Sequence, residues 1–127
     1  MSAAEQRVRD AYAAFNAHNA DGALAHMQPD VDWPTVWEGG RAVGHDAVRD
    51  YWTRQWAEID PQAQPLVVRE LPDGRVHVDV LLVVRDGEGR RIGEQHVVNV
   101  FTLRGGLVAR MDVADPGRPA PRIELGG

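Results

Sequence analysis

The spacing of the apolar residues along this chain changes at Pro65. Before that point apolar side chains recur at helical intervals, as Val8, Ala11, Tyr12 and Phe15 do on one face. After it the pattern is typical of strands. The pattern predicts helices over residues 4–18, 23–27 and 46–59, a short strand over 31–36, and longer strands over 65–71, 75–85, 91–103 and 107–114. Helices followed by a strand meander indicate an α+β fold, with the helices on one face of a curved antiparallel sheet.

Clusters of glycine, proline and aspartate separate the predicted strands. The breaks are Pro72-Asp73-Gly74, Asp86-Gly87-Glu88-Gly89 and Gly105-Gly106, and all three favour hairpin turns. Consecutive strands are therefore expected to be antiparallel neighbours. A sheet of this kind that curls over its helices leaves a cavity with one closed end, between the apolar helix faces and the concave face of the sheet.

The length of the chain sets the number of domains. A chain of 127 residues can bury one hydrophobic core but not two. We therefore expect one domain over residues 1–115. The segment 116–127 is rich in proline and glycine, which predicts a mobile tail.

Composition excludes several kinds of partner. The net charge is −5 and the arginines are interspersed with acidic residues, so no basic patch for nucleic acid is expected. No apolar run approaches the roughly 20 residues that a membrane-spanning helix needs. The first residues lack the basic and apolar parts of a secretory signal, which favours a cytoplasmic location.

Missing residue types restrict the chemistry. The chain has no cysteine and no lysine, and its only serine is Ser2. These absences exclude a thiolate nucleophile, a lysine Schiff base and a serine–histidine pair. If the protein is an enzyme, Asp, Glu, His and Tyr are left to act as its acids and bases. The glycine-rich stretch 86–93 precedes a strand rather than a helix, so it is no phosphate-binding loop and no cofactor is expected. No metal is expected either, because no compact set of ligands is present.

Most of the aromatic residues fall on faces that would line the expected cavity. Trp52 and Trp56 lie four residues apart on the inner face of the third predicted helix, and Tyr12 and Phe15 lie on that of the first. Such a cavity suits a flat or cyclic apolar ligand, although ordinary core packing is the alternative for any one of these side chains. The predicted ligand-binding residues are Tyr12, Phe15, Trp33, Thr35, Trp37, Trp52, Trp56, Asn99 and Phe101.

Several short segments carry a family resemblance. They are YAAFNAHNADG at residues 12–22, PDV at 29–31 before a tryptophan strand, GHDAVRDYW at 44–52 and VFTLRGGLV at 100–108. In this order they resemble the nuclear transport factor 2-like (NTF2-like) superfamily. Within it the chain is most similar to the SnoaL-like branch, with its polyketide cyclase-like and ketosteroid isomerase-like members. The resemblance implies a cone-shaped, cystatin-like fold in which three N-terminal helices and a curved antiparallel or mixed sheet enclose a pocket.

The resemblance also implies a homodimer, because members of this family commonly pair through the outer face of the sheet. Leu81, Val83, Val98 and Val100 would give that face its apolar content. The resemblance is specific for the fold and less so for function, since this superfamily includes isomerases, dehydratases, cyclases, epoxide hydrolases and binding domains without activity.

Only part of the ketosteroid isomerase-like site has matching residues in this chain. That enzyme uses an aspartate base beside an oxyanion hole formed by a tyrosine and a protonated aspartate. The tyrosine position corresponds to Ala11, the base to Thr35, and the protonated acid to Asn99, whose amide can still donate a hydrogen bond. Tyr12 lies beside the tyrosine position, about 100° around the helix. Asp32 is the nearest alternative base. The catalytic hypothesis is therefore that Asp32 acts with Tyr12 and Asn99.

A second polar group lies on the predicted strands 75–85 and 91–103. If their hairpin is centred near Glu88, Asp79 lies opposite His96, and a carboxylate that orients a histidine can form a general base. The alternative is an ion pair on the outer face of the sheet, because a one-residue change of register would be needed to turn both groups inward. His96 and Asp79 are the second choice of catalytic pair.

The sequence leaves two main functions open. The first is a cofactor-independent isomerase, lyase or cyclase that acts on a small apolar carbonyl or cyclic compound. The second is a homodimeric binding or accessory protein without enzymatic activity, which the missing base at Thr35 favours. Both predict a small apolar organic ligand. A third hypothesis, a purely structural dimer, would require the cavity to be packed shut.

Overall fold

The structure, a computed structural model, describes residues 1–119, with side chains described for residues 1–114. Local sequence signals mark where its helices begin. At the first helix, the Ser2 Oγ accepts a hydrogen bond from the backbone N–H of Glu5 at 3.1 Å, and the Glu5 carboxylate accepts one from the N–H of Ser2 at 2.9 Å. At the second helix, the Asn19 side chain accepts a hydrogen bond from the N–H of Gly22.

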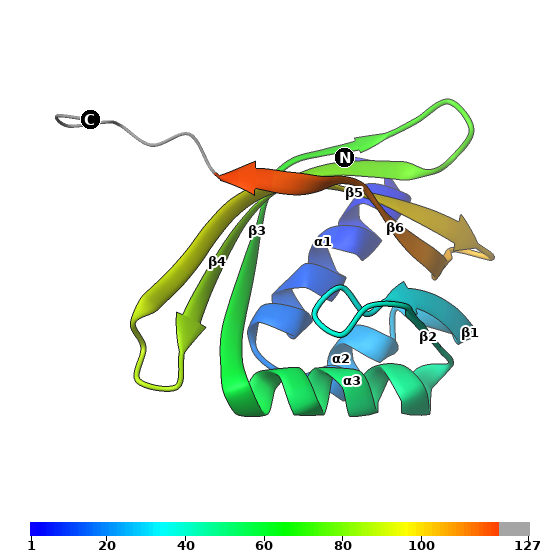
Figure 1. The fold of residues 1–127 in the computed structure, drawn as a ribbon. Helices are drawn as coiled ribbons and strands as arrows, with labels where there is room; N and C mark the ends of the chain where they lie inside the picture. The colour runs from blue at the N-terminus through cyan, green and yellow to red at the C-terminus, as the bar shows by residue number, and fades with distance from the viewer. Residues whose placement is uncertain (120–127) are drawn as a thin grey trace, which may run out of the picture.

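Helices and strands follow one another along the described residues (Figure 1). The helices are α1 (Ala3–Asn16), α2 (Ala20–Leu24) and α3 (His45–Glu58), and the strands are β1 (Met27–Pro34), β2 (Arg41–Val43), β3 (Ile59–Glu70), β4 (Val76–Asp86), β5 (Arg91–Arg104) and β6 (Leu107–Pro119). The α+β class predicted from the sequence is confirmed. Among the described residues, no helix is both long enough and apolar enough to cross a membrane.

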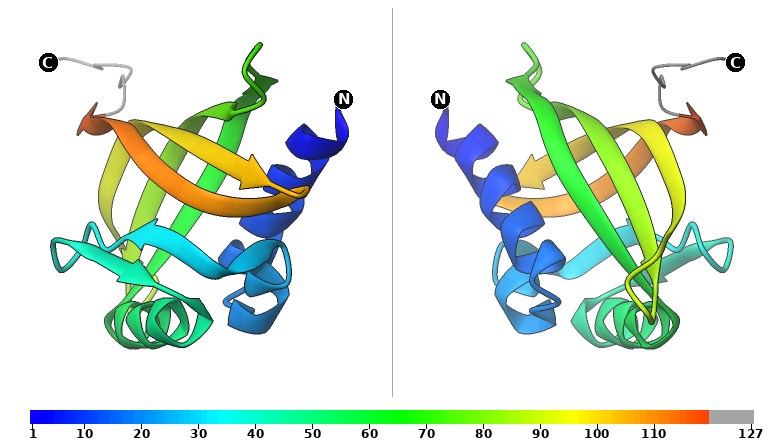
Figure 2. Two further views of the ribbon diagram at one scale, coloured as in Figure 1. Left: turned by 90° about the vertical axis from the view of Figure 1, so that its right-hand side faces the viewer. Right: turned by 90° about the vertical axis from the view of Figure 1, so that its left-hand side faces the viewer.

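The strands form one curved sheet in the order β2-β1-β6-β5-β4-β3. β1 and β6 pair in parallel and the other neighbours are antiparallel, so the sheet is mixed. The hairpins that join β3 to β4, β4 to β5 and β5 to β6 occur at the three predicted turns. Figure 2 shows the sheet curling around α1, while α3 lies across one end of it. This curvature gives the sheet a concave face that is turned toward the helices.

Strand alternation decides which residues meet the helices. Val76, Val78 and Val80 of β4 are at most 1% exposed and belong to one core with Val8 of α1 and Val48 of α3. The residues between these three valines face the outer side of the sheet. Two faces of different chemistry therefore run along each long strand, and only the inner face can contribute to a site beneath the helices.

The first half differs from the prediction in several places: α1 ends at Asn16 rather than at residue 18, and β1 spans Met27–Pro34 rather than residues 31–36. α2 begins at Ala20 rather than at residue 23, because Asn19 caps it. β2 was not predicted, since a strand of three residues gives almost no periodic signal. It follows a turn at Gly39 and Gly40, both of which have the positive φ that glycine adopts without strain.

Two of the long strands, β3 and β6, extend well beyond their predicted ranges. β3 begins at Ile59, directly after α3, rather than at residue 65. Pro61 ends the helix as expected but is also part of β3, which tolerates a residue without N–H because it is an edge strand. β6 continues to Pro119 rather than ending at residue 114, with Gln95 of β5 opposite Pro119. The predicted tail, residues 116–127, thus starts within β6, and residues 120–127 lie outside the described part.

Candidate functional site

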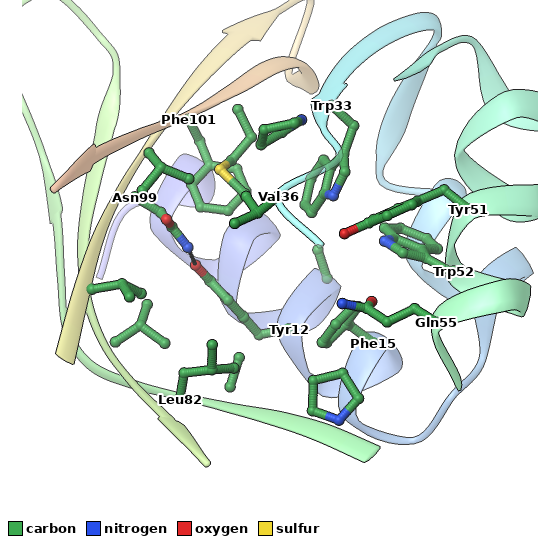
Figure 3. Close-up of a pocket in the computed structure, with 18 of the residues that line it drawn as sticks. Tyr12, Phe15, Trp33, Val36, Tyr51, Trp52, Gln55, Leu82, Asn99 and Phe101 are labelled. Atoms are coloured by element: carbon green, nitrogen blue, oxygen red, sulfur yellow. Dashed lines mark hydrogen bonds between the residues drawn. The ribbon is translucent and has the colours of Figure 1, made fainter. Parts of the chain in front are cut away.

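A cavity of about 150 Å³ lies between α1, α3 and the concave face of the sheet (Figure 3). It has a buried end and a rim. At the buried end Met27, Trp52 and Phe101 are at most 3% exposed. At the rim Val36, in the loop after β1, is 65% exposed, and Gln55 of α3 is half-buried. A ligand that enters past this loop would lose most of its hydration shell at the buried end.

A buried polar pair, Tyr12 and Asn99, lies in the cavity wall. The Asn99 amide of β5 donates a hydrogen bond to the Tyr12 hydroxyl of α1, with 3.0 Å between Nδ2 and Oη. Each of these residues is 7% exposed. Burial raises the pKa of the Tyr12 hydroxyl well above its usual value, although the hydrogen bond from Asn99 lowers it. The Tyr12 hydroxyl therefore keeps its proton at neutral pH.

This polar pair, Tyr12 and Asn99, has hydrogen-bonding capacity left over. The Asn99 Oδ1 is buried without a partner, and no described group accepts the Tyr12 proton. With the amide turned over, Tyr12 would donate to Oδ1 and both N–H groups of the amide would be unused. Either orientation leaves at least one donor for the cavity. Because an unpaired buried polar group costs about 1–3 kcal/mol, a ligand oxygen that accepts from this pair would be favoured.

Aromatic side chains form the wall beside the polar pair. Trp52 meets Trp33 edge to face, with 5.3 Å between ring centroids, and meets Phe15 in the same way at 5.6 Å. Tyr12 packs edge to face on Phe101 at 5.6 Å. Contacts of this geometry hold each ring in one orientation. The wall is therefore formed before any ligand arrives, and its shape suits a flat ring.

Three polar residues of the cavity wall, Tyr51, Gln55 and Gln95, are not among the predicted ligand-binding residues. Tyr51 and Gln55 lie one turn apart on α3, so their side chains share a face, and both point into the cavity (Figure 3). The Tyr51 hydroxyl accepts a hydrogen bond of 3.0 Å from the backbone N–H of Trp37. Burial raises the pKa of Tyr51 above its usual value. Its helical spacing was visible in the sequence, but that spacing fits a core residue equally well.

Six of the nine predicted ligand-binding residues line the cavity, namely Tyr12, Phe15, Trp33, Trp52, Asn99 and Phe101. The other three do not. Thr35 is buried in the turn after β1, where its Oγ1 donates to a backbone carbonyl at 2.8 Å. Trp37 lies beyond the end of β1, where strand alternation no longer applies, and is 44% exposed. Trp56 stacks between His18 and Trp52 instead of reaching the cavity.

Asp32, the predicted base, lies outside the cavity wall. Two arginines hold its carboxylate: Arg110 Nη1 is 2.9 Å from Oδ2, and Arg41 donates to Oδ1. This cluster links β1, β2 and β6. Trp33 occupies the cavity side of β1, and alternation along the strand turns the neighbouring Asp32 to the opposite side. The structure therefore does not bring Asp32 together with the polar pair, which corrects the predicted arrangement.

The second predicted pair, His96 and Asp79, is not formed either. His96 lies opposite Leu81, and Asp79 lies opposite Val98, so the ladder differs by two residues from the expected register. An irregularity of the ladder beside the turn contributes to this difference. Because the side-chain period of a strand is two, the shift leaves both residues on the outer face of the sheet. Neither one lines the cavity.

The chemistry of the wall is that of neutral polar groups. Among the described residues, the wall contains no Asp, Glu, His or Arg side chain, and its polar groups are tyrosine hydroxyls and carboxamides. Such groups can bind and polarise an uncharged oxygen, but none of them takes up a proton near neutral pH. In the described part of the chain, no three His, Asp or Glu side chains gather as metal ligands would.

Comparison with protein families gives one match. A family model described as a SnoaL-like domain matches residues 8–111. No curated protein matches the sequence. The matched stretch runs from α1 into β6 and so includes every residue of the polar pair and of the aromatic wall.

Solved structures share the fold over most of the chain. An NTF2-like protein of unknown function from Burkholderia pseudomallei is 26% identical with a TM-score of 0.78, and the match covers 91% of this chain and 92% of that one. TerC, crystallised with polyporic acid, is 24% identical with a TM-score of 0.77 over 90% and 92%. A Mycobacterium tuberculosis protein in complex with estradiol-17β-hemisuccinate is 20% identical with a TM-score of 0.77 over 90% and 94%. The predicted resemblance to the NTF2-like superfamily is confirmed.

Proposed function

This chain belongs to the SnoaL-like domain family, and we propose that its cavity binds a small, uncharged, cyclic carbonyl compound without converting it. The observation that carries this proposal is the chemistry of the wall. Aromatic surfaces surround one polar pair with an unused donor, and no described wall residue can take up a proton at neutral pH. This favours the second of the two functions that the sequence left open.

The size of the cavity limits the ligand. A volume of about 150 Å³ is comparable to that of apolar cavities that accept benzene. A single six-membered ring with a short carbonyl substituent therefore suits it, with the substituent at the polar pair. Larger ring systems would have to displace side chains at the rim, where Val36 and Gln55 lie.

The ligands of two proteins with this fold support an organic small molecule as the occupant. TerC was crystallised with polyporic acid, and the Mycobacterium tuberculosis protein was in complex with estradiol-17β-hemisuccinate. Both matches cover 90% of this chain.

One observation favours a catalytic alternative. The polar pair can donate to an oxygen that gains negative charge during a reaction, and this form of stabilisation serves isomerases, lyases and cyclases that use no cofactor. Such an enzyme would still need a base, which the described wall does not supply. Product formed from a bound carbonyl compound would support this alternative, whereas an unchanged ligand would support binding alone.

Replacing Tyr12 by phenylalanine is expected to weaken the binding of acetophenone. The change removes only the hydroxyl, and the loss of one hydrogen bond of about 0.5–1.5 kcal/mol corresponds to a dissociation constant about 2- to 12-fold higher. Isothermal titration calorimetry with acetophenone as the probe measures this ratio.

Ethylbenzene is the matched control ligand, because it has a methylene group where acetophenone has its carbonyl. Its affinity should be no lower in the Tyr12→Phe variant than in the unaltered protein. An equal loss of affinity for both ligands would contradict a carbonyl contact at Tyr12.

The outer face of the sheet supports a proposal about assembly: two copies pair through it. Leu81 and Val83 of β4, with Val98 and Val100 of β5, lie on the side that faces away from the helices. Burying such side chains between two copies removes apolar surface from water.

Sedimentation equilibrium is expected to give the mass of a dimer for the unaltered protein and the mass of a monomer for the Leu81→Glu variant. Val43→Glu, at an exposed site on β2, is the control and should keep the dimer. A monomeric wild-type protein would contradict the proposal.

A further inference from the structure

The cavity has a second hydrogen-bonding wall, which comes from a different element than the polar pair does. Tyr51 and Gln55 contribute it from α3, whereas the polar pair comes from α1 and β5. In Figure 3 the Tyr51 hydroxyl and the Gln55 side chain enter the cavity from the side opposite to Tyr12 and Asn99. A ring bound between the two walls would therefore present one end to each of them.

The Tyr51 hydroxyl has unused hydrogen-bonding capacity. A hydroxyl can donate one hydrogen bond and accept two. In the described structure it accepts one, from the backbone N–H of Trp37, and no described group accepts its proton. Tyr51 is 2% exposed, so bulk water has little access to it. Gln55 is half-buried at the rim, where water can satisfy its amide. Tyr51 is thus the group on α3 that gains most from a ligand oxygen.

The position of the Tyr51 hydroxyl is fixed by the loop between β1 and β2. Trp37 donates to it from this loop, and the carboxylate of Glu38 in the same loop pairs with Arg54 of α3 through two bonds of 2.8 and 2.9 Å. These contacts hold the loop against α3. A hydrogen bond to a group that is already held in place costs less conformational entropy than one to a free side chain.

We propose that the cavity selects ligands with an oxygen function at each end of one ring, and that Tyr51 is the residue that determines the preference for the second oxygen. This rests on the proposed function, in which the polar pair binds the first oxygen, a carbonyl. The second oxygen, from a hydroxyl or a carbonyl, bonds to the Tyr51 hydroxyl. Tyr51 accommodates both kinds because a proton and a lone pair remain available to it.

Selection of this kind depends on polarity more than on size. A ligand that brings a methyl group to Tyr51 leaves the hydroxyl buried and unpaired, whereas a ligand hydroxyl pairs with it. A site built to bond a ligand hydroxyl rejects the analogue that lacks it far more strongly than a hydrophobic pocket rejects one methylene group. If instead Tyr51 served only to hold the loop, the methyl compound would bind better, because a hydroxyl loses its hydration on entering an apolar cavity.

Three ligands with one ring test the proposal: acetophenone, 4-hydroxyacetophenone and 4-methylacetophenone. The hydroxyl and methyl groups are similar in size, so the ratio of their dissociation constants reports polarity. Calorimetric titration of the full chain is expected to give about 3- to 10-fold tighter binding of the 4-hydroxy compound than of the 4-methyl compound. The Tyr51→Phe variant is expected to lose this preference while still binding acetophenone.

Two further variants separate the second contact from other effects. Thr53→Ala, at an exposed site on α3, should leave the ratio unchanged, and Tyr12→Phe should weaken all three ligands alike. Tyr51→Phe also removes the acceptor of the Trp37 N–H. A change in the loop alone would weaken the three ligands equally and leave the ratio as it was, which would overturn the proposal.

If the Tyr51→Phe variant fails to fold, the wild-type protein alone still tests the proposed preference for a second oxygen. Binding of the 4-methyl compound that equals or exceeds that of the 4-hydroxy compound overturns the role of Tyr51. If acetophenone binds and the added hydroxyl brings no gain, only the second contact fails. If none of the three compounds binds, the proposed carbonyl-binding function fails, and the preference fails with it.

Discussion

Replacing Trp52 by alanine is expected to lower the free energy of unfolding by about 3–5 kcal/mol. Trp52 is 1% exposed, and its ring contacts Phe15, Trp33 and Trp56. The substitution would remove the largest fully buried side chain of the core and leave a void that adjoins the existing cavity. Three rings would lose the partner that fixes their orientation. Denaturant unfolding followed by circular dichroism measures the loss without relying on tryptophan emission.

Trp37→Ala is the matched control, because the same side chain is removed from a site that is 44% exposed and outside the cavity wall. It is expected to cost less than about 1 kcal/mol. Similar losses in the two variants would mean that Trp52 is not the centre of a packed aromatic wall.

Replacing Asn99 by aspartate is expected to make the stability of the protein fall as the pH rises. Asn99 is 7% exposed and its surroundings are apolar apart from Tyr12, so burial should raise the pKa of the introduced carboxyl group in the folded state. Well below pH 4 both the folded and the unfolded state hold the proton, and the variant loses little. As the pH rises toward the folded pKa, only the unfolded state releases its proton freely, and the folded state loses stability.

The size of this effect follows from the difference between the two pKa values. If the folded pKa is about 2–3 above the unfolded value, the free energy of unfolding at pH 8 is about 2–4 kcal/mol lower than at pH 4, relative to the unaltered protein. Denaturant unfolding at several pH values measures it. Asn99→Leu has nearly the same shape and no titratable group, so its stability relative to the unaltered protein should not vary with pH. Parallel curves for the aspartate and leucine variants would show that this position is accessible to water.

The fold could be predicted from the sequence because its signals are local. The periodicity around Val8 and Val48 marks two helices, and glycine-containing turns separate the long strands. The strand positions that were missed depend on features that local periodicity does not carry. β2 is too short to show a period, and the start of β3 is hidden by Pro61 and Pro65, which only an edge strand tolerates. Whether a strand lies at an edge is a property of the whole sheet.

The candidate site could be predicted in part. The six predicted residues that line the cavity lie on regular helices and strands, where spacing determines the face. The same rule argues against Asp32, since Trp33 is its neighbour and the two cannot share a face of β1. The register of β4 and β5 depends on an irregularity that the turn sequence does not reveal, so the opposition of Asp79 and His96 could not be predicted reliably.

The role of the Tyr51 hydroxyl could not be predicted from the sequence. Its spacing predicts a buried face of a helix, which is correct, but burial alone does not distinguish a core tyrosine from one whose hydroxyl borders a cavity. That difference depends on the loop after β1, which follows no period and supplies the bond from Trp37. The function of a side chain in such a cavity is set by its hydrogen-bond partners, and these come from segments far apart in the sequence.

The most direct test of carbonyl binding is the ¹³C chemical shift of acetophenone labelled at its carbonyl carbon, measured with and without the protein. A hydrogen bond from the polar pair polarises the carbonyl, so the resonance is expected to move downfield on binding and to move back toward the free value in the Tyr12→Phe variant. The label should remain in acetophenone throughout. A bound carbonyl whose shift is the same with and without the Tyr12 hydroxyl, or a label that passes into a new product, would contradict the account.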